Sequence, residues 1–344
     1  MKRFACKTCG NEVYFDNQAC LSCGNGLAYD PNAFDMVSLA GPTPPLVCAN
    51  AGAAGCNWIV TDPAPETFCT ACRHNRTVPD ISSEENRELW AAIELAKRQL
   101  FYSLMRWNLP MPTKEEDPAN GLAFDFLADT VKEDGTTEPV MTGHAEGLIT
   151  LNIAEGDDAE REQRRTSMGE PYRTLVGHMR HEVGHYYWDR LVRDSDRIDE
   201  FRALFGDERE DYGAALKRHY ESGPPADWMQ AHVSTYATAH AWEDWAETWA
   251  HWIHMIDGLE TAWSYGITCD PRAGGTMTFG NMFQFDPYAA PGAQEVVDAW
   301  VPLTIAINSV NRSLGQPDLY PFVLSTPVME KLGFIHSLIA AYRG

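Results

Sequence analysis

The sequence predicts an α+β protein in which a small β module at the N-terminus precedes a larger part dominated by helices. Eight of the nine cysteines fall within the first 72 residues, which is typical of small metal-bound β modules. Beyond residue 80, apolar residues at helical spacing predict several helices, near 84–106, 172–191, 196–204, 208–221, 231–257, 292–312 and 328–342. Strands are expected near 122–127 and 147–154.

The composition excludes some classes of partner. The 344-residue chain carries 49 acidic and 27 basic side chains, which gives a formal charge of −22 at pH 7. This charge repels nucleic-acid phosphates, so we expect no nucleic-acid partner. The N-terminus lacks the apolar stretch of a secretory signal, and no later segment is apolar over the length of a bilayer span. We therefore expect a cytoplasmic protein without a membrane partner.

Two cysteine pairs at the N-terminus have the spacing of a zinc ribbon. Cys6 and Cys9, and then Cys20 and Cys23, are each separated by two residues, which lets both thiolates of a pair turn toward one ion. Residues 10–17 are expected to form a short strand and a turn between the pairs. These four cysteines are therefore predicted to hold one structural zinc ion.

A second quartet predicts another structural zinc site: Cys48, Cys56, Cys69 and Cys72. Its first pair is wider, but a strand expected at 58–60 precedes the second pair, so a variant ribbon is predicted. Disulfides are the alternative, and the reducing cytosol disfavours them. Prolines between and after the quartets predict a tandem zinc-ribbon module at 1–80 and a second domain at 81–344. The ninth cysteine, Cys269, is expected to be a buried apolar residue.

The helix predicted at 172–191 carries the sequence His181-Glu182-Val183-Gly184-His185. Because His181 and His185 are four residues apart, one helical turn places both imidazoles on the same face, where they can bind one zinc ion. Glu182 lies beside them as a candidate general base. His178 shares this face and is expected only to pack, since another imidazole ligand would close the position that a water molecule needs.

A catalytic zinc site needs a third protein ligand, which we expect from a second helix. The proline-free segment 239–252 has tryptophans at helical intervals and carries Glu243 and Glu247 four residues apart on one face. One of these glutamates could bind zinc while the other accepts a hydrogen bond from a ligand histidine. Solvated surface acids are the alternative interpretation.

The histidine pair followed by a helical Glu-x-x-Ala at Glu243 to Ala246 resembles the gluzincins, the thermolysin-like zinc peptidases. In that pattern the glutamate is the third zinc ligand. The resemblance therefore assigns this role to Glu243, with Glu247 or Asp244 as the acid that supports a ligand and Glu247 as the alternative ligand.

Nearly the whole chain is similar to a bacterial family of zinc-binding metallopeptidases with N-terminal zinc ribbons. The similar stretches are the ribbon cysteines, 143–153, 181–191 and 242–248. The resemblance implies a zincin-like catalytic domain and peptidase-like chemistry, and it names no substrate. In zincins the edge strand before the active-site helix binds extended peptide, so 147–154 is a candidate edge strand, with an inner strand as the alternative.

The expected function is a zinc metallopeptidase, a hydrolase that cleaves a peptide or protein with one catalytic and two structural zinc ions. Zinc lowers the pKa of a water molecule, and Glu182 takes its proton. Tyr236 is the first candidate donor to the developing oxyanion, with His232, His240 and Tyr186 as alternatives. Two other functions stay open, a zinc amidohydrolase of non-peptide substrates and a catalytically silent scaffold whose ribbons bind a protein partner.

Overall fold

The computed structural model describes residues 1–344 except 62–66, 133, 169–173, 268–284 and 344, so the expectation for Cys269 lies outside the described residues. The chain forms two compact units. The N-terminal unit comprises Lys2–Met168 and Arg173–Glu182, and the C-terminal unit comprises Val183–Gly344 with Met1. A domain boundary near residue 80 stays a prediction.

The cysteine-rich part of the N-terminal unit consists of short β structures. Its elements are the antiparallel pair β1 (Phe4–Ala5) and β2 (Glu12–Val13), the antiparallel pair β3 (Leu27–Asp30) and β4 (Asp35–Ser38), the short helix α1 (Ala51–Ala54), and the 3₁₀ turn Cys72–His74. Trp58 and Ile59, in the strand predicted at 58–60, form isolated bridges with Tyr29 and Val47. Short β structures therefore accompany the cysteines, although residues 58–60 form isolated bridges instead of the predicted strand.

Helix α2 (Glu84–Arg106) has the predicted bounds because its first turn is capped. The hydroxyl of Ser83 accepts a hydrogen bond from the backbone N–H of Asn86 at 3.3 Å, and two glutamates occupy the positive end of the helix. Near its other end, the ring of Tyr102 lies 5.8 Å from that of Phe15, centroid to centroid. The helix thus packs directly against the cysteine-rich part.

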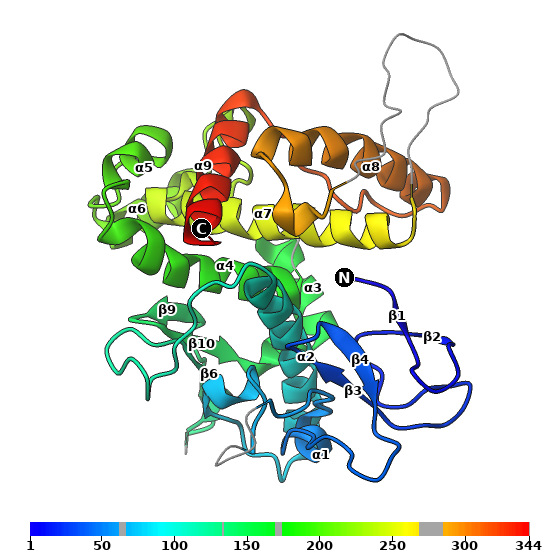
Figure 1. The fold of residues 1–344 in the computed structure, drawn as a ribbon. Helices are drawn as coiled ribbons and strands as arrows, with labels where there is room; N and C mark the ends of the chain where they lie inside the picture. The colour runs from blue at the N-terminus through cyan, green and yellow to red at the C-terminus, as the bar shows by residue number, and fades with distance from the viewer. Residues whose placement is uncertain (62–66, 133, 169–173, 268–284, 344) are drawn as a thin grey trace. The chain divides into compact units, whose positions relative to one another are not determined.

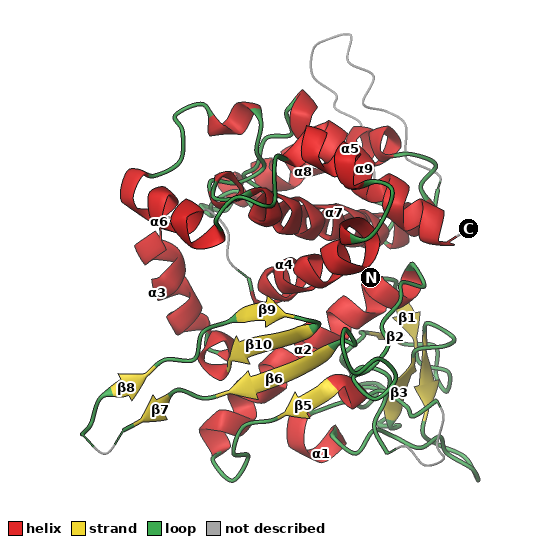
Figure 2. Ribbon diagram, turned by 90° about the vertical axis from the view of Figure 1, so that its left-hand side faces the viewer, coloured by secondary structure: helices red, strands yellow, loops and turns green. Residues whose placement is uncertain are grey.

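A mixed four-stranded sheet completes this unit, in the order β5 (Asn75–Thr77), β6 (Ala123–Leu127), β10 (Leu148–Asn152) and β9 (Gly143–Ala145) (Figure 2). β10 runs parallel to β6 and antiparallel to β9. β10 is therefore an inner strand, and the expectation that 147–154 forms the sheet edge is wrong because the short β9 covers that side. The remaining elements are β7 (Thr130–Val131), β8 (Thr137–Glu138), the 3₁₀ turn Ile153–Gly156 and α3 (Asp158–Met168).

Helix α4 (Leu175–Trp188) carries the predicted histidine pair and continues as a π-helical turn over Asp189–Arg193. The boundary between the two units falls inside α4, after Glu182. One continuous helix therefore contributes residues to both units. The expected helical residues 172 and 173 lie outside the described part of the chain.

The C-terminal unit is built from helices, which are α5 (Ile198–Phe205), α6 (Tyr212–Ser222), α7 (Ala241–Ser264), α8 (Ala293–Ser313) and α9 (Thr326–Arg343), with 3₁₀ turns at Trp228–Gln230, Tyr236–Thr238 and Pro287–Ala289. α7 packs against α5, α8 and α9 (Figure 1). Its tryptophans Trp245, Trp249 and Trp252 are buried. Among the described helices of the chain, none is long and apolar enough to cross a membrane.

Helix α7 begins later than the expected residue 231. His240 has an extended backbone, with φ −160° and ψ 153°, and its Nδ1 accepts a hydrogen bond from the backbone N–H of Trp242 at 3.1 Å. This histidine therefore caps the helix, and the preceding residues form the 3₁₀ turn Tyr236–Thr238. The predicted class, an α+β protein dominated by helices, is confirmed.

Candidate metal centre

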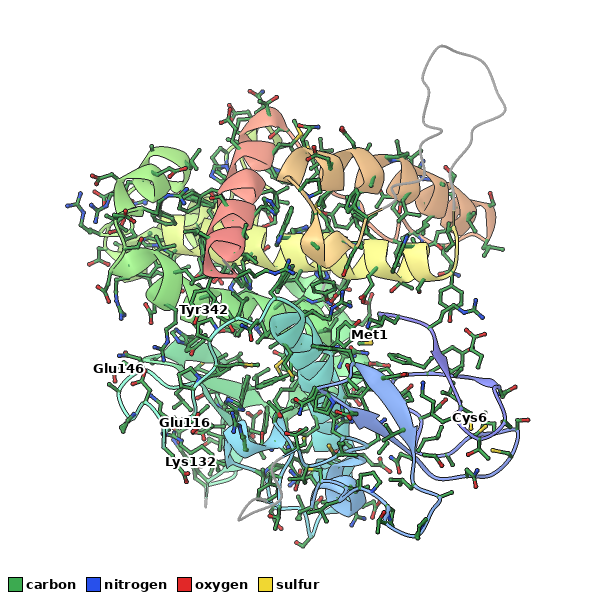
Figure 3. All side chains as sticks on the ribbon, viewed as in Figure 1. Met1, Cys6, Glu116, Lys132, Glu146 and Tyr342 are labelled. Atoms are coloured by element: carbon green, nitrogen blue, oxygen red, sulfur yellow. The ribbon has the colours of Figure 1, made fainter. Side chains whose placement is uncertain are left out.

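The first cysteine quartet gathers its four sulfur atoms within 4.8 Å of one another: Cys6, Cys9, Cys20 and Cys23. Figure 3 draws the side chains of this region and labels Cys6. Backbone N–H groups of Cys9 and Thr8 lower the pKa of the Cys6 thiol to about 6, which favours the thiolate that binds metal. The sulfurs of Cys9 and Cys23 lie on exposed residues, so this site is open to solvent at its rim.

The second quartet has the same compact arrangement but is entirely buried: Cys48, Cys56, Cys69 and Cys72. The sulfur of Cys72 lies 3.5 Å from Oε2 of Glu94 on α2. Glu94 in turn accepts a hydrogen bond from the ammonium group of Lys97 at 2.7 Å, and both side chains are fully buried. This buried cation partly balances the negative charge of a four-thiolate zinc site.

A third group forms from side chains of α4 and α7. The ligand atoms of His181, His185 and Glu243 all lie within 4.8 Å of one another, and the three residues are buried. Nε2 of His185 is 3.6 Å from Oε2 of Glu243, and both residues belong to the C-terminal unit. His181 lies one turn earlier on the same helix, so the continuity of α4 fixes its position relative to His185.

Gly184 allows α4 and α7 to approach closely. A Cβ atom at this position would lie 3.1 Å from Cα of Ala246, a backbone atom that cannot move aside easily. The indole N–H of Trp245 donates a hydrogen bond to the carbonyl oxygen of Gly184 at 2.8 Å. The glycine inside the histidine motif therefore brings the histidine helix next to the helix that carries Glu243.

Tyr212 holds the carboxylate of Glu243. Its hydroxyl, on the first residue of α6, donates a hydrogen bond to Oε1 of Glu243 at 2.6 Å. A partner of this kind orients a ligand and adjusts its basicity. Tyr212 could not be predicted from the sequence, because it precedes Glu243 by 31 residues on another helix and no local spacing connects the two.

The two other acids considered on α7 contact different partners. Oε2 of Glu247 accepts a hydrogen bond from the hydroxyl of Ser234 at 2.6 Å. Asp244 accepts one from the ammonium group of Lys331 at 2.5 Å, and burial raises the pKa of this carboxyl to about 7. Neither carboxylate belongs to the group formed by the two histidines and Glu243.

Among the candidate oxyanion donors, Tyr236 lies in the 3₁₀ turn before α7. Burial and the charge of Glu243 raise the pKa of its phenol, so the hydroxyl keeps its proton and can donate it in a hydrogen bond. His240 uses Nδ1 to cap α7, and Nε2 of His232 lies 3.7 Å from Asp244. The hydroxyl of Tyr186 accepts a hydrogen bond from Arg190.

His178 is not a member of the group of zinc ligands, as expected, but it does more than pack. Its Nε2 lies 3.3 Å from Oε1 of Glu182, and its Nδ1 lies 3.3 Å from Oε2 of Glu155. Burial alone would lower the pKa of this imidazole, but the hydrogen bonds to Glu155 and Glu182 outweigh it and raise the pKa to about 9. His178 is therefore an imidazolium between two carboxylates at neutral pH.

The three groups match two kinds of zinc site. Four thiolates form a closed tetrahedral structural site, whereas two imidazoles and one carboxylate form a catalytic site that keeps a position for water. The donor atoms present here, sulfur in the quartets and nitrogen with oxygen in the helix group, fit zinc in both cases. The fold and these groups define a zinc-binding protein with a metallopeptidase-type site.

Comparison with known proteins gives the family. Residues 86–338 match the family described as "Putative zinc-binding metallo-peptidase", and residues 3–83 match a zinc-ribbon domain. The chain belongs to this metallopeptidase family. Relatives include the uncharacterized proteins Mb2598c of Mycobacterium bovis and Rv2568c of Mycobacterium tuberculosis, each 43% identical over 341 residues, which cover 98% of this chain and 95% of the relative. No solved structure matched.

Proposed function

We propose that this protein is a zinc-dependent peptidase of the gluzincin type, which hydrolyses a bond in a peptide or protein substrate. His181, His185 and Glu243 would hold one catalytic zinc ion, and the two cysteine quartets would each hold a structural one. The observation that carries the proposal is the compact group of two imidazoles and one carboxylate, with Glu182 in the same helical turn. Membership of the family supports it.

The chemistry divides between the metal and the chain. When bound, zinc acts as a Lewis acid that lowers the pKa of water and polarises a carbonyl group. Glu182 accepts the proton of the attacking water at its carboxylate and returns it to the leaving amine. Tyr236, whose phenol stays protonated, donates a hydrogen bond to the substrate carbonyl oxygen as negative charge develops there.

The sheet supports a peptide as the substrate class. Because β10 is internal, the sheet ends on this side with β9, whose outer backbone groups can pair with an extended chain. Backbone pairing of this kind is independent of side chains. We therefore propose that specificity depends on the side chains around the zinc ligands more than on this edge.

The variant Glu182→Gln tests the proposed function. Turnover of a fluorogenic peptide library should fall about 10²- to 10⁴-fold, because the amide cannot accept the proton, while zinc content stays that of the wild type. Glu221→Gln, at an exposed glutamate on α6, is the control and should retain most of the activity. Equal activity of Glu182→Gln and the wild type would refute the proposal. Hydrolysis of small amides by a wild type that leaves every peptide intact would favour the amidohydrolase.

A further inference from the structure

Glu155, His178 and Glu182 form a chain of three side chains within the N-terminal unit. His178 lies one helical turn before Glu182 on α4 and contacts one oxygen of its carboxylate, Oε1, through Nε2 at 3.3 Å. Through Nδ1 it contacts Oε2 of Glu155, also at 3.3 Å. Both imidazole nitrogens therefore face a carboxylate oxygen, and His178 is not a member of the group of zinc ligands.

Glu155 is held by the sheet and by α2. It belongs to the 3₁₀ turn Ile153–Gly156, which follows directly on β10, and the side chain of Asn152 caps this turn by accepting a hydrogen bond from Ala154 at 3.0 Å. A Cβ atom on Gly156 would lie 2.5 Å from the carbonyl oxygen of Leu89 on α2, so the turn lies directly against that helix. Glu155 itself is 1% exposed.

Because Glu155 is held in place, it can also hold the imidazole of His178 on α4 in one orientation. The side chain of Glu182 has three rotatable bonds, and holding it in the one conformation that proton transfer needs costs conformational entropy. A charged donor on one carboxylate oxygen reduces this freedom, because hydrogen bonds between charged groups are shorter and stronger than neutral ones. Proton transfer depends on the correct placement of the base within hydrogen-bond reach of the water.

We propose that His178, held in place by Glu155, is a positioning residue that fixes the carboxylate of Glu182 for proton transfer. The inference rests on the proposed function for the role of Glu182 as the base, and on the contacts within the N-terminal unit for the role of His178. The imidazole of His178 keeps Oε1 engaged.

The test uses the full-length zinc-loaded protein and the variants His178→Gln and Glu155→Gln. A glutamine at position 178 can donate to one carboxylate but cannot bridge two. We expect kcat to fall about 10- to 100-fold in His178→Gln and less in Glu155→Gln, with KM and zinc content unchanged. His251→Gln is the control, because His251 is a helical histidine that bonds to Tyr320 and is buried, whereas the side chain of His178 is 16% exposed. Unchanged kcat in both His178→Gln and Glu155→Gln would overturn the proposal.

A second readout does not depend on turnover. Acetohydroxamate chelates zinc and can donate a hydrogen bond to a neighbouring carboxylate, so its affinity, measured by calorimetry, reports the placement of Glu182. We expect His178→Gln to weaken this affinity about tenfold in the wild-type background and to have no further effect in a Glu182→Gln background. Equal losses in both backgrounds, as a merely structural role would give, would overturn the proposal.

The two readouts separate the inference from the proposed function. If the wild type cleaves no peptide, the proposed function fails. The comparison of acetohydroxamate affinities in the wild-type and Glu182→Gln backgrounds then still decides whether His178 acts through Glu182. If His178→Gln does not fold, the same comparison is made with Glu155→Gln, for which we expect a smaller difference between the two backgrounds. Equal losses of acetohydroxamate affinity in both backgrounds would then count against the proposal.

Discussion

The cysteine quartets and the helix group differ in the number and kind of donor atoms that they offer to a metal ion. Each quartet offers four sulfur atoms, which complete a tetrahedron, whereas α4 and α7 offer two nitrogens and one oxygen, which leave a position for a water molecule. The quartets lie on short strands and turns with little core of their own. The helix group lies on long helices that are packed by tryptophans. Metal should therefore stabilise the fold at the quartets and supply chemistry at the helices.

The two quartets also differ from each other. Cys9 and Cys23 of the first quartet are exposed, while every cysteine of the second is buried. The second quartet is also connected to α2 through Glu94 and Lys97. Loss of metal at the second quartet should therefore disturb the core of the N-terminal unit, and loss at the first should stay local.

The largest effect is expected from Cys56→Ser. This variant should lose one zinc ion and the cooperative unfolding of the N-terminal unit, because structural zinc contributes ~10–16 kcal/mol of binding free energy in small zinc domains. Cys9→Ser, the matched variant of the first quartet, should also lose one zinc ion but retain the helical circular dichroism of α2. Thermal unfolding and elemental analysis measure both. Equal destabilisation by the two variants would remove the distinction between the quartets.

A smaller effect is expected from Gly184→Ala. The new methyl group would press on the backbone of α7 at Ala246, which should destabilise the protein by about 1–3 kcal/mol and weaken zinc binding by the helix group. Gly333→Ala on α9 is the control, because a Cβ atom there meets nothing within 4 Å. Urea unfolding and zinc competition measure the result. A Gly184→Ala protein as stable as the control would contradict the close approach of the two helices.

Tyr212→Phe should act on the helix group alone. Loss of the hydrogen bond to Glu243 should lower zinc affinity there about tenfold, with little change in the free energy of unfolding. Tyr220→Phe, an exposed tyrosine on the same helix, provides the control. Competition with a fluorescent chelator distinguishes the weakest of the bound zinc ions. If zinc affinity is the same in both variants, Tyr212 does not support the ligand.

The smallest effect concerns the pH dependence of stability. Because the folded state raises the pKa of His178 from 6.5 to about 9, the imidazolium stabilises the fold fully below pH 6.5, and this contribution is lost as the pH rises through 9. The stability advantage of the wild type over His178→Gln should therefore shrink between these pH values. Burial lowers the pKa of His251 to about 4, so His251→Gln should show no such change in this window. A constant advantage over His178→Gln would contradict the ion pairs.

Local spacing predicted the parts of the site that lie close together in sequence. The cysteine pairs and the pair His181 and His185 have only two to seven residues between their members, and the Glu243 assignment came from a resemblance. Tyr212, Lys331 and Glu155 could not be predicted, because each meets its partner only after distant helices and strands have packed. Spacing carries no information about such contacts.

The order of the strands and the start of α7 could likewise not be predicted. The alternation of Leu148–Asn152 predicts a strand but not its neighbours, and the three-residue β9 that makes it internal has too little pattern to be recognised. The start of α7 depends on a histidine cap, which is rarer than a serine or aspartate cap. Helix α2, which begins after a serine, was predicted with its observed bounds.

A separate catalytic zinc site is tested most directly by the number of zinc ions per chain, measured by elemental analysis in the wild type and in the double variant His181→Ala, His185→Ala, both purified without added metal. We expect three zinc ions in the wild type and two in the variant, with peptide turnover lost together with the third. Equal zinc content in the two proteins would contradict a separate catalytic zinc site on the helices.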